Sequence, residues 1–294
     1  MNGGPKALLV TVNFRQAECT LRLLNSVCQL DGFASCHLVI VDNDSGDGSA
    51  ERIRQAASSL SNLELLESPS NRGYFGGAKW ALDHYFARHG IPDWVIVCNN
   101  DIVFDSPDFL DTLLARDPRA QGILAPAVIS GLTGFDSNPL IVKRPGRIRT
   151  LRYRFLLSTY RVAWCTQWLA PLVRKGRHRL HKGRSSRLNA RTQIYAPHGS
   201  FVIFSRRFFE AGGFIDDGCF LYAEEFGVAE MCLRLGLPII HDPELRVSHN
   251  DNQTTGRMLS RRGYLLQREG LKYALGKYFQ SGLGMRDRSS RSSS

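Results

Sequence analysis

The segment DWVIVCNND (93–101) decides the fold class of this chain. Its short apolar run, rich in β-branched residues, is typical of a buried strand and ends in the polar triplet Asn99–Asp101. Similar runs precede it at 7–14 (ALLVTVNF), 37–44 (HLVIVDND) and 63–68 (LELLES), with stretches of helical character between them at 16–30, 49–60 and 76–89. This alternation predicts an α/β fold in which a mostly parallel sheet is flanked by helices, with right-handed crossovers.

Polar residues stand at the carboxyl ends of three of these predicted strands. They are Asn13 after Val12, the triplet Asp42–Asp44, and the triplet Asn99–Asp101. In open α/β sheets, ligands bind outside the carboxyl ends of the strands. Asp and Asn also begin ordinary turns, but three clusters at equivalent strand ends favour one shared crevice.

The segment NRGYFGGA (71–78) opens the third helical stretch and contains three glycines. Glycines at this place let backbone N–H groups come close to a phosphate or a sugar at a helix N-terminus. The chain contains neither G-x-G-x-x-G nor G-x-x-x-x-G-K-[ST], which disfavours a dinucleotide or Walker-type site. Tyr74 and Phe75 pack either on a ligand bound at this place or in the protein core.

The charge of the chain is unevenly distributed. Of its 294 residues, 43% are hydrophobic and 22% are charged, which excludes wholesale disorder, collagen and a disulfide-scaffold peptide. The net charge is +11, yet residues 137–209 hold 17 Lys and Arg and no Asp or Glu. The remaining 21 basic residues are outnumbered by all 27 acidic residues. Such a basic segment points to anionic lipid, a phosphate-rich substrate or nucleic acid.

The basic segment has an amphipathic character. Apolar residues recur at near-helical spacing over 151–173, where arginines are interleaved, and RKGRHRLHKGRSSR (174–187) follows as a basic loop. An apolar stripe with Trp residues and basic flanks is typical of a helix that lies in a membrane interface, where anionic headgroups attract it. Two alternatives are a helix that covers the core beside a solvated loop, and a nucleic-acid-binding arm. No recognition motif supports the arm, so we expect no nucleic-acid partner.

The sequence contains no evident targeting or spanning segment. The apolar run near the N-terminus is too short for a signal peptide, and no uncharged apolar stretch reaches about 18 residues. Seven cysteines, without a C-x-x-C or a zinc-ligand spacing, indicate reduced thiols. We expect a cytoplasmic protein that lies peripherally on the cytoplasmic face of the inner membrane.

Seven segments, taken in order, resemble the family 2 glycosyltransferases of the GT-A fold. They are VTVNFR (10–15), VDNDSGDGS (41–49), NRGYFGGA (71–78), CNND (98–101), HGSFVIFSRRFFEAGGF (198–214), FLYAEE (220–225) and HDPELRVSH (241–249). The resemblance covers about 6–140 and 195–255. Within the family, the chain looks most like bacterial enzymes that add rhamnose or similar sugars to cell-surface polysaccharides.

The resemblance implies a GT-A, Rossmann-like domain organised in several parts. We expect a nucleotide-sugar-binding half, a basic amphipathic helical insertion on the membrane or acceptor side, an acceptor and catalytic half of the same domain, a C-terminal helix and a disordered tail. These parts correspond to residues 1–136, 137–192, 193–255, 256–284 and 285–294.

The resemblance also implies a divalent metal, Mg²⁺ or Mn²⁺, that neutralises the departing diphosphate. Asp101 matches the metal-binding Asp of the family's DxD-type motif, and His249 matches a late His that completes the metal shell. The motif here reads Asn99-Asn100-Asp101, with amides at two positions. We therefore expect a weak metal site until the diphosphate supplies further oxygen ligands.

The acceptor hydroxyl must lose a proton as it attacks, and a carboxylate within reach can accept it. The family usually supplies Glu-Asp after an aromatic-rich run, whereas this chain has Glu224-Glu225. Glu225 matches the base by position, and Glu224 is the alternative. Repulsion between the two carboxylates is expected to raise one pKa, although an acidic pair also suits an ordinary helix N-terminus.

By position in the family motifs, nine residues are expected to form the nucleotide-sugar site. They are Val12, Asn13, Asp42, Asn43, Ser45, Asn71, Gly73, Gly77 and Asn100. Asp42 matches the residue that typically contacts the base, and Asn100 stands where contact with ribose or diphosphate is usual.

The resemblance as a whole implies an inverting glycosyltransferase. It would move a sugar from a nucleotide-diphosphate donor, of the dTDP-rhamnose or UDP-sugar type, to a hydroxyl of a glycan or polyprenyl-linked glycan on an anionic membrane surface. Two alternatives are a non-catalytic nucleotide-sugar-binding protein, suggested by the amides in the metal motif, and a basic nucleic-acid-binding protein.

Overall fold

Four parallel strands form one half of the sheet, in the order β3-β2-β1-β4. The computed structural model describes residues 5–165, 190–250 and 260–279. The strands of this part of the chain are β1 (Ala7–Asn13), β2 (Cys36–Asp42), β3 (Leu63–Glu67), β4 (Trp94–Asn99), β5 (Ile102–Phe104), β6 (Ile123–Ser130), β7 (Thr192–Ile194), β8 (Phe201–Ser205) and β9 (Ile239–His249). The helices are α1 (Ala17–Val27), η1 (Phe33–Ser35), α2 (Ser49–Ala57), α3 (Tyr74–His89), α4 (Phe109–Leu114), α5 (Arg147–Leu156), α7 (Arg206–Glu210), α8 (Glu224–Leu235) and α9 (Arg261–Tyr278).

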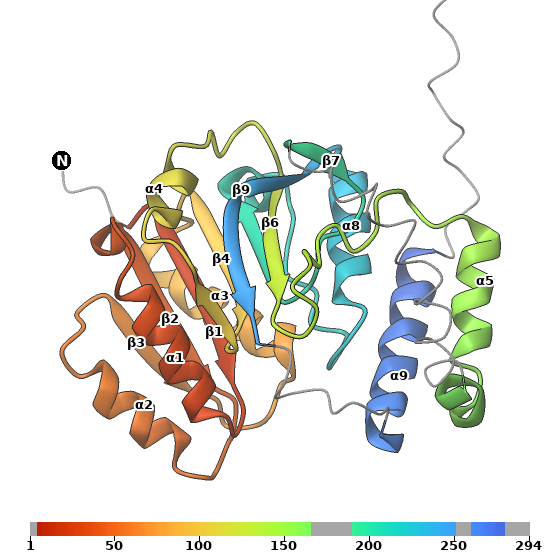
Figure 1. The fold of residues 1–294 in the computed structure, drawn as a ribbon, viewed down its shortest axis with the longest axis horizontal. Coiled ribbons are helices and arrows are strands. Elements are labelled where there is room, and N and C mark those ends of the chain that lie inside the picture. The colour runs from red at the N-terminus through yellow and green to blue at the C-terminus, as the bar shows by residue number, and fades with distance from the viewer. Residues whose placement is uncertain (1–4, 166–189, 251–259, 280–294) are drawn as a thin grey trace, which may run out of the picture.

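The other half of the sheet is mixed. β8 runs antiparallel between β4 and β6, and β9 is parallel to β6, so β9 points in the same direction as β1, β2 and β4. The short strands β5 and β7 pair antiparallel with the two ends of β9. The predicted α/β fold with a mostly parallel sheet is confirmed. The carboxyl ends of β1, β2, β4 and β9 therefore meet at one edge, at the bottom of Figure 1.

Helices cover both faces of the sheet. One apolar cluster joins α1, α2 and α4 to one face, and a second joins α3, α8 and α9 to the other (Figure 1). Successive residues of β1 face opposite clusters, and Leu8 and Leu9 are both completely buried. Burial on both faces explains why the strands read as continuous apolar runs and do not alternate with polar residues.

The prediction of a single continuous helix over 151–173 is wrong. α5 begins earlier, at Arg147, and ends at Leu156, and a second helical turn occupies 160–165. Thr159 caps the start of this second turn, because its Oγ1 accepts a hydrogen bond from the N–H of Val162, as an N-cap residue does. The remaining part of the predicted helix and the basic loop 174–187 lie outside the described residues.

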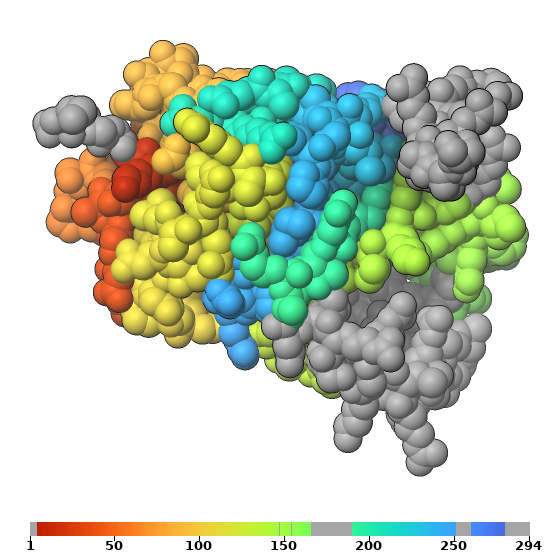
Figure 2. Space-filling view, turned by 90° about the horizontal axis from the view of Figure 1, so that it is seen from above, coloured from red at the N-terminus to blue at the C-terminus, as the bar shows by residue number. Residues whose placement is uncertain are grey.

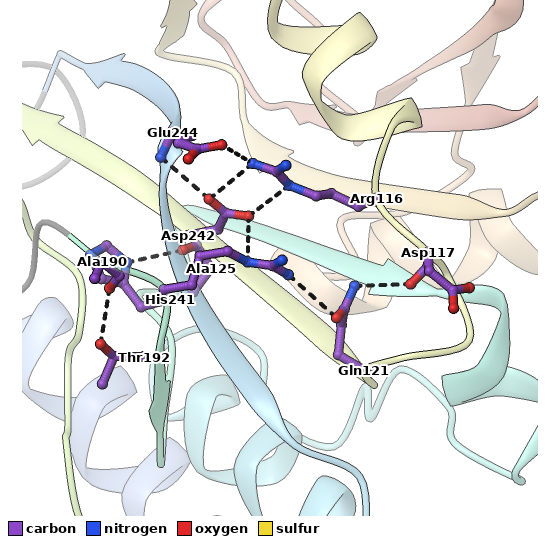
Figure 3. A network of polar contacts seen from close by, with 10 residues as sticks. Arg116, Asp117, Gln121, Ala125, Ala190, Thr192, His241, Asp242 and Glu244 are labelled. Atoms are coloured by element: carbon purple, nitrogen blue, oxygen red, sulfur yellow. Dashed lines mark hydrogen bonds and ion pairs between the residues drawn. The ribbon is translucent and has the colours of Figure 1, made fainter.

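Buried carboxylates anchor both ends of the basic segment. Arg144 forms a bidentate ion pair with Glu230 of α8, and both N–O distances are 2.7 Å. Beyond the undescribed stretch, Arg191 approaches the fully buried Asp242 at 3.1 Å, and Arg116 contacts the same carboxylate at 3.0 Å (Figure 3). The acid-free segment is therefore attached to acidic groups of the globular body.

The C-terminal helix expected over 256–284 is observed as α9, over Arg261–Tyr278. Ser260 caps it by accepting a hydrogen bond from the N–H of Gly263 at 2.9 Å. The expected disordered tail (285–294) lies outside the described residues. Among the helices that the structure describes, none combines the length and the apolar character needed to cross a membrane.

Candidate active site

The ends of β1 and β2 form a buried polar network. Asn13 donates from Nδ2 to Oδ1 of Asp42 at 2.8 Å and to Oγ of Ser45 at 3.1 Å. Ser45 donates to the same Asp42 oxygen at 2.6 Å, and its backbone N–H donates to Oδ2. All three residues are at most 5% exposed. They therefore hold the two loops in one conformation, and only a small part of their surface is accessible to a ligand.

Asn100 connects this network to the β4–β5 turn. Its Nδ2 donates to Oγ1 of Thr20 at 3.0 Å, and Thr20 in turn donates to Oδ1 of Asn13 at 2.9 Å. Asn100 is 9% exposed. The residues expected to contact a nucleotide at the ends of β1, β2 and β4 therefore lie in one continuous cluster.

The glycine-rich segment 71–78 lies beside the same strand ends. Asn43 donates from Nδ2 to Oδ1 of Asn71 and to the carbonyl of Gly73, both at 3.0 Å. A Cβ on Gly77 would lie 3.1 Å from both methyl groups of Val12. Gly73 adopts φ +74°, and a Cβ there would lie 2.0 Å from the carbonyl oxygen of Phe220, so this position requires glycine.

Asp101 and His249 meet across the β5–β9 ladder. The pairing places Ile102 opposite His249, and Oδ1 of Asp101 lies 3.1 Å from Nε2 of His249. Both side chains are largely buried, and within the described residues Oδ1 of Asp101 has no hydrogen-bond partner besides this contact with His249. Asn99 is also adjacent, with Nδ2 3.5 Å from the same His nitrogen.

This pair fits a divalent cation. Two neighbouring ligands of an octahedral ion with bonds near 2.1 Å stand about 3 Å apart, which matches the separation of these two atoms. Within the residues that the structure describes, no group of three or more His, Cys, Asp or Glu side chains could hold a metal. Substrate oxygens and water are further ligands that a divalent cation would take beside such a pair.

Glu224 and Glu225 begin α8 after a strained turn. Tyr222 and Ala223 both have φ +70°, a conformation that costs a non-glycine residue about 1–2 kcal/mol. α9 holds this turn closely, because a Cβ on Gly270 would lie 2.4 Å from the carbonyl oxygen of Tyr222. Strain that neighbouring structure maintains is found frequently at functional sites.

The two carboxyl groups differ in environment. Burial, and then the charge of Glu225, raises the pKa of Glu224 to about 8, so Glu224 is protonated at neutral pH. Burial also raises the pKa of Glu225, against hydrogen bonds from backbone groups that include Gly199. Glu225 keeps more exposed surface than Glu224. Glu225 is therefore the better placed of the two to accept a proton from a substrate.

The turn His198–Ser200 links the carboxylates to the metal side. A Cβ on Gly199 would lie only 2.7 Å from Oε1 of Glu225, and the rings of His198 and His249 are 5.9 Å apart. Tyr74 donates its hydroxyl to the carbonyl of Gly199 at 3.1 Å. Burial raises the pKa of Tyr74, and the negative charges of Glu224, Asp101 and Glu225 add to this shift.

The structure therefore brings together the residues expected at the metal, base and glycine-loop positions. Phe75 belongs to the core, being 1% exposed, whereas Tyr74 reaches the turn beside Glu225. His198 and Gly199 were not among the predicted site residues, and Tyr74 was predicted to pack either on a ligand or in the core. The His-Gly-Ser sequence at 198–200 was the available signal, since a small residue before a strand permits the close approach of another side chain.

The raised pKa of Glu224 predicts a pH-dependent stability. The folded chain binds this proton more tightly than an unfolded carboxyl, whose pKa is 4.5. The contribution to stability is thus fully present below about pH 4.5 and is lost as the pH rises to about 8. Between about pH 6 and about pH 9, we expect the free energy of unfolding of Glu224→Gln to fall by a few kcal/mol less than that of the wild type. Urea unfolding at the two pH values measures this difference. The exposed control Glu210→Gln should follow the wild type, and equal slopes for all three proteins would contradict the assignment.

The comparison with known protein families agrees with the geometry of the site. Residues 8–212 match the family described as Glycosyl transferase family 2, which is more than half of the chain. The chain belongs to glycosyl transferase family 2. No curated protein sequence matches this family 2 chain.

Solved structures share the fold of the family 2 chain at low sequence identity. The mannosyltransferase PcManGT from Pyrobaculum calidifontis, in complex with GDP-Man and Mn²⁺, is 18% identical with a TM-score of 0.50 over 90% of this chain and 59% of that chain. S. aureus TarS 1-349 is 12% identical with a TM-score of 0.53 over 83% and 60%. GalNAc-T7 with UDP, GalNAc and Mn²⁺ is 13% identical with a TM-score of 0.55 over 88% and 47%.

These similarities assign the fold. The family 2 chain has the GT-A type of α/β fold, with a mixed, mostly parallel sheet flanked by helices. It spans about half to three fifths of the length of the three solved chains it matches.

Proposed function

We propose that the protein is an inverting glycosyltransferase that uses a nucleotide-diphosphate sugar as donor. One observation carries the proposal: the Asp101–His249 pair and the Glu225 carboxylate approach the same turn at His198–Gly199. A cation ligand set and a carboxylate base near the same place are what a single displacement at an anomeric carbon requires. The solved relatives with GDP-Man or UDP and Mn²⁺ support this class of donor.

In the proposed mechanism, Glu225 accepts the proton of the acceptor hydroxyl as that oxygen attacks the anomeric carbon. Asp101 and His249 would hold Mg²⁺ or Mn²⁺, which supplies positive charge against the departing diphosphate. The network of Asn13, Asp42 and Ser45 fixes the loops that would face the nucleotide. Glu224, protonated at neutral pH, avoids a second negative charge beside the base.

The finer specificity is part of the proposal. We infer a donor of the dTDP-rhamnose or UDP-sugar type and an acceptor hydroxyl on a glycan or a polyprenyl-linked glycan. The motifs at 98–101 and 198–225 support this reading, because they resemble those of bacterial enzymes that build cell-surface polysaccharides.

A thermal-shift panel of UDP-, dTDP- and GDP-sugars, with and without Mn²⁺, tests the donor class. A ligand present at about 100 times its dissociation constant stabilises the native state by about 2.7 kcal/mol. We expect one nucleotide to raise the melting temperature by several degrees, more strongly with Mn²⁺. Steeply salt-dependent binding of nucleic acid without any response to nucleotide sugars would instead favour the nucleic-acid-binding alternative.

Gly199 should matter for the position of the base. In Gly199→Ala the new methyl group would lie 2.7 Å from Oε1 of Glu225, and because this is the flexible end of a side chain, the carboxylate moves while the fold survives. We expect kcat to fall at least about tenfold, with little change in melting temperature, because a displacement of about 1 Å has effects of this size or larger.

Steady-state kinetics and a melting curve check this prediction. Gly146→Ala is the matched control, because an added Cβ there meets nothing within 4 Å. Wild-type kcat in Gly199→Ala would show that Glu225 does not have to occupy its observed position.

A further inference from the structure

The outward face of α5 is apolar. Ile148, Leu151 and Phe155 are 86%, 62% and 66% exposed. Their spacing of three and four residues places them on one side of the helix. Large apolar side chains that gather on one exposed surface indicate an interaction site.

The opposite face of α5 already serves the protein core. Tyr153 and Leu157 pack against the apolar cluster shared with α8 and α9, and the ring of Tyr153 lies 6.1 Å from that of Phe226. α5 stands at one end of the molecule (Figures 1 and 2), and α9 lies beside it (Figure 1). The exposed stripe of Ile148, Leu151 and Phe155 therefore lies outside this packed cluster.

Positive charge borders this apolar stripe. Lys143, Arg149, Arg152 and Arg161 are exposed within the stretch 137–209, which contains no acidic residue. A hollow beside α5 has the same combination of apolar and cationic groups. It is lined by Leu157, Ser158, Arg268, Leu271, Lys272, Leu275 and Gly276.

We propose that α5 docks on the surface of a bilayer that contains anionic lipids, with Ile148, Leu151 and Phe155 inserted at the headgroup level. Apolar side chains on one face and cations at its edges complement this surface, because insertion removes apolar area from water while anionic headgroups face the arginines. The identity of a lipid-linked acceptor rests on the proposed function, whereas the docking itself does not.

Vesicle co-sedimentation of the purified full chain tests the proposal. The vesicles contain either phosphatidylcholine alone or equal parts of phosphatidylcholine and phosphatidylglycerol. We expect binding to the anionic vesicles only, and a fall of at least about a hundredfold in the partition coefficient for the triple variant Ile148→Ser, Leu151→Ser, Phe155→Ser. The control Leu233→Ser, Leu265→Ser removes exposed leucines from α8 and α9 and should bind as the wild type does.

Two results would overturn the docking proposal. The first is equal sedimentation of the wild type and the triple variant. The second is a change in oligomeric mass of the triple variant without vesicles, which would make the face a protein interface. Release of nucleoside diphosphate with a soluble acceptor should stay within about twofold in the triple variant, so failure of docking and failure of the proposed function are distinguished.

Discussion

Glu225→Gln is expected to lower donor turnover by about a thousandfold, because an amide cannot accept the proton of the acceptor hydroxyl. The substitution keeps the size of the side chain and its place beside Gly199. Donor affinity should change by less than about threefold, since the proposed role of Glu225 is toward the acceptor, whereas Asn13 and Asp42 form a separate network at the proposed nucleotide side.

Single-turnover kinetics and donor titration check this prediction separately. Glu210→Gln, an exposed glutamate of α7, serves as the control and should keep wild-type turnover. Full activity of Glu225→Gln together with an inactive Glu224→Gln would exchange the roles of the two carboxyl groups. Such a result would also require Glu224 to be ionised in the complex, despite its pKa of about 8 in the free protein.

Asp101→Asn is expected to lower turnover at least about a hundredfold and to weaken the Mn²⁺-dependent part of nucleotide binding. The substitution removes the carboxylate that lies 3.1 Å from His249, and a neutral amide is a much poorer ligand for a hard cation. Isothermal titration of nucleoside diphosphate, with and without Mn²⁺, measures the effect independently of turnover.

Asp105→Asn is the matched control for this substitution. Asp105 follows β5 and interacts at the surface with Ser248 and Arg246, away from the His249 ring. It should leave both Mn²⁺ dependence and turnover unchanged. If Asp101→Asn binds nucleotide with an unaltered response to Mn²⁺, the metal assignment is contradicted.

Local sequence patterns predicted the parallel half of the fold well. The strands at 7–13, 36–42, 63–67 and 94–99 were recognisable because residues buried on both faces form continuous apolar runs. The polar strand ends were equally clear, since parallel strands bring their carboxyl ends to one edge. The structure places Asn13, Asp42 and Asn100 in one network there.

Local sequence patterns could not predict which distant strands pair with one another. Nothing local in 239–249 shows that this strand pairs with β6 on one side and with β5 and β7 on the other. That arrangement nevertheless brings His249 to Asp101. The resemblance to the family suggested the pair, whereas composition and periodicity did not.

Tertiary contacts also determine the turn before α8. Tyr222 and Ala223 have side chains that disfavour a positive φ, so their sequence does not predict the conformation they adopt. Contacts with α9 compensate, because Gly270 leaves just enough space for the carbonyl of Tyr222. The break in the basic helix has a local cause, because the side chain of Thr159 caps a new helical turn. The apolar periodicity of the segment had predicted a continuous helix.

The central claim is that Asp101, His249 and Glu225 serve one sugar-transfer reaction. Its most direct test is the release of nucleoside diphosphate from the nucleotide sugar selected by the thermal-shift panel, with Mn²⁺ and a glycan acceptor. The account predicts steady release by the wild type, and release at least about a hundredfold slower in Glu225→Gln although that variant still binds the donor. Donor binding by the wild type without any release would contradict it and would leave a nucleotide-sugar-binding protein without catalytic activity.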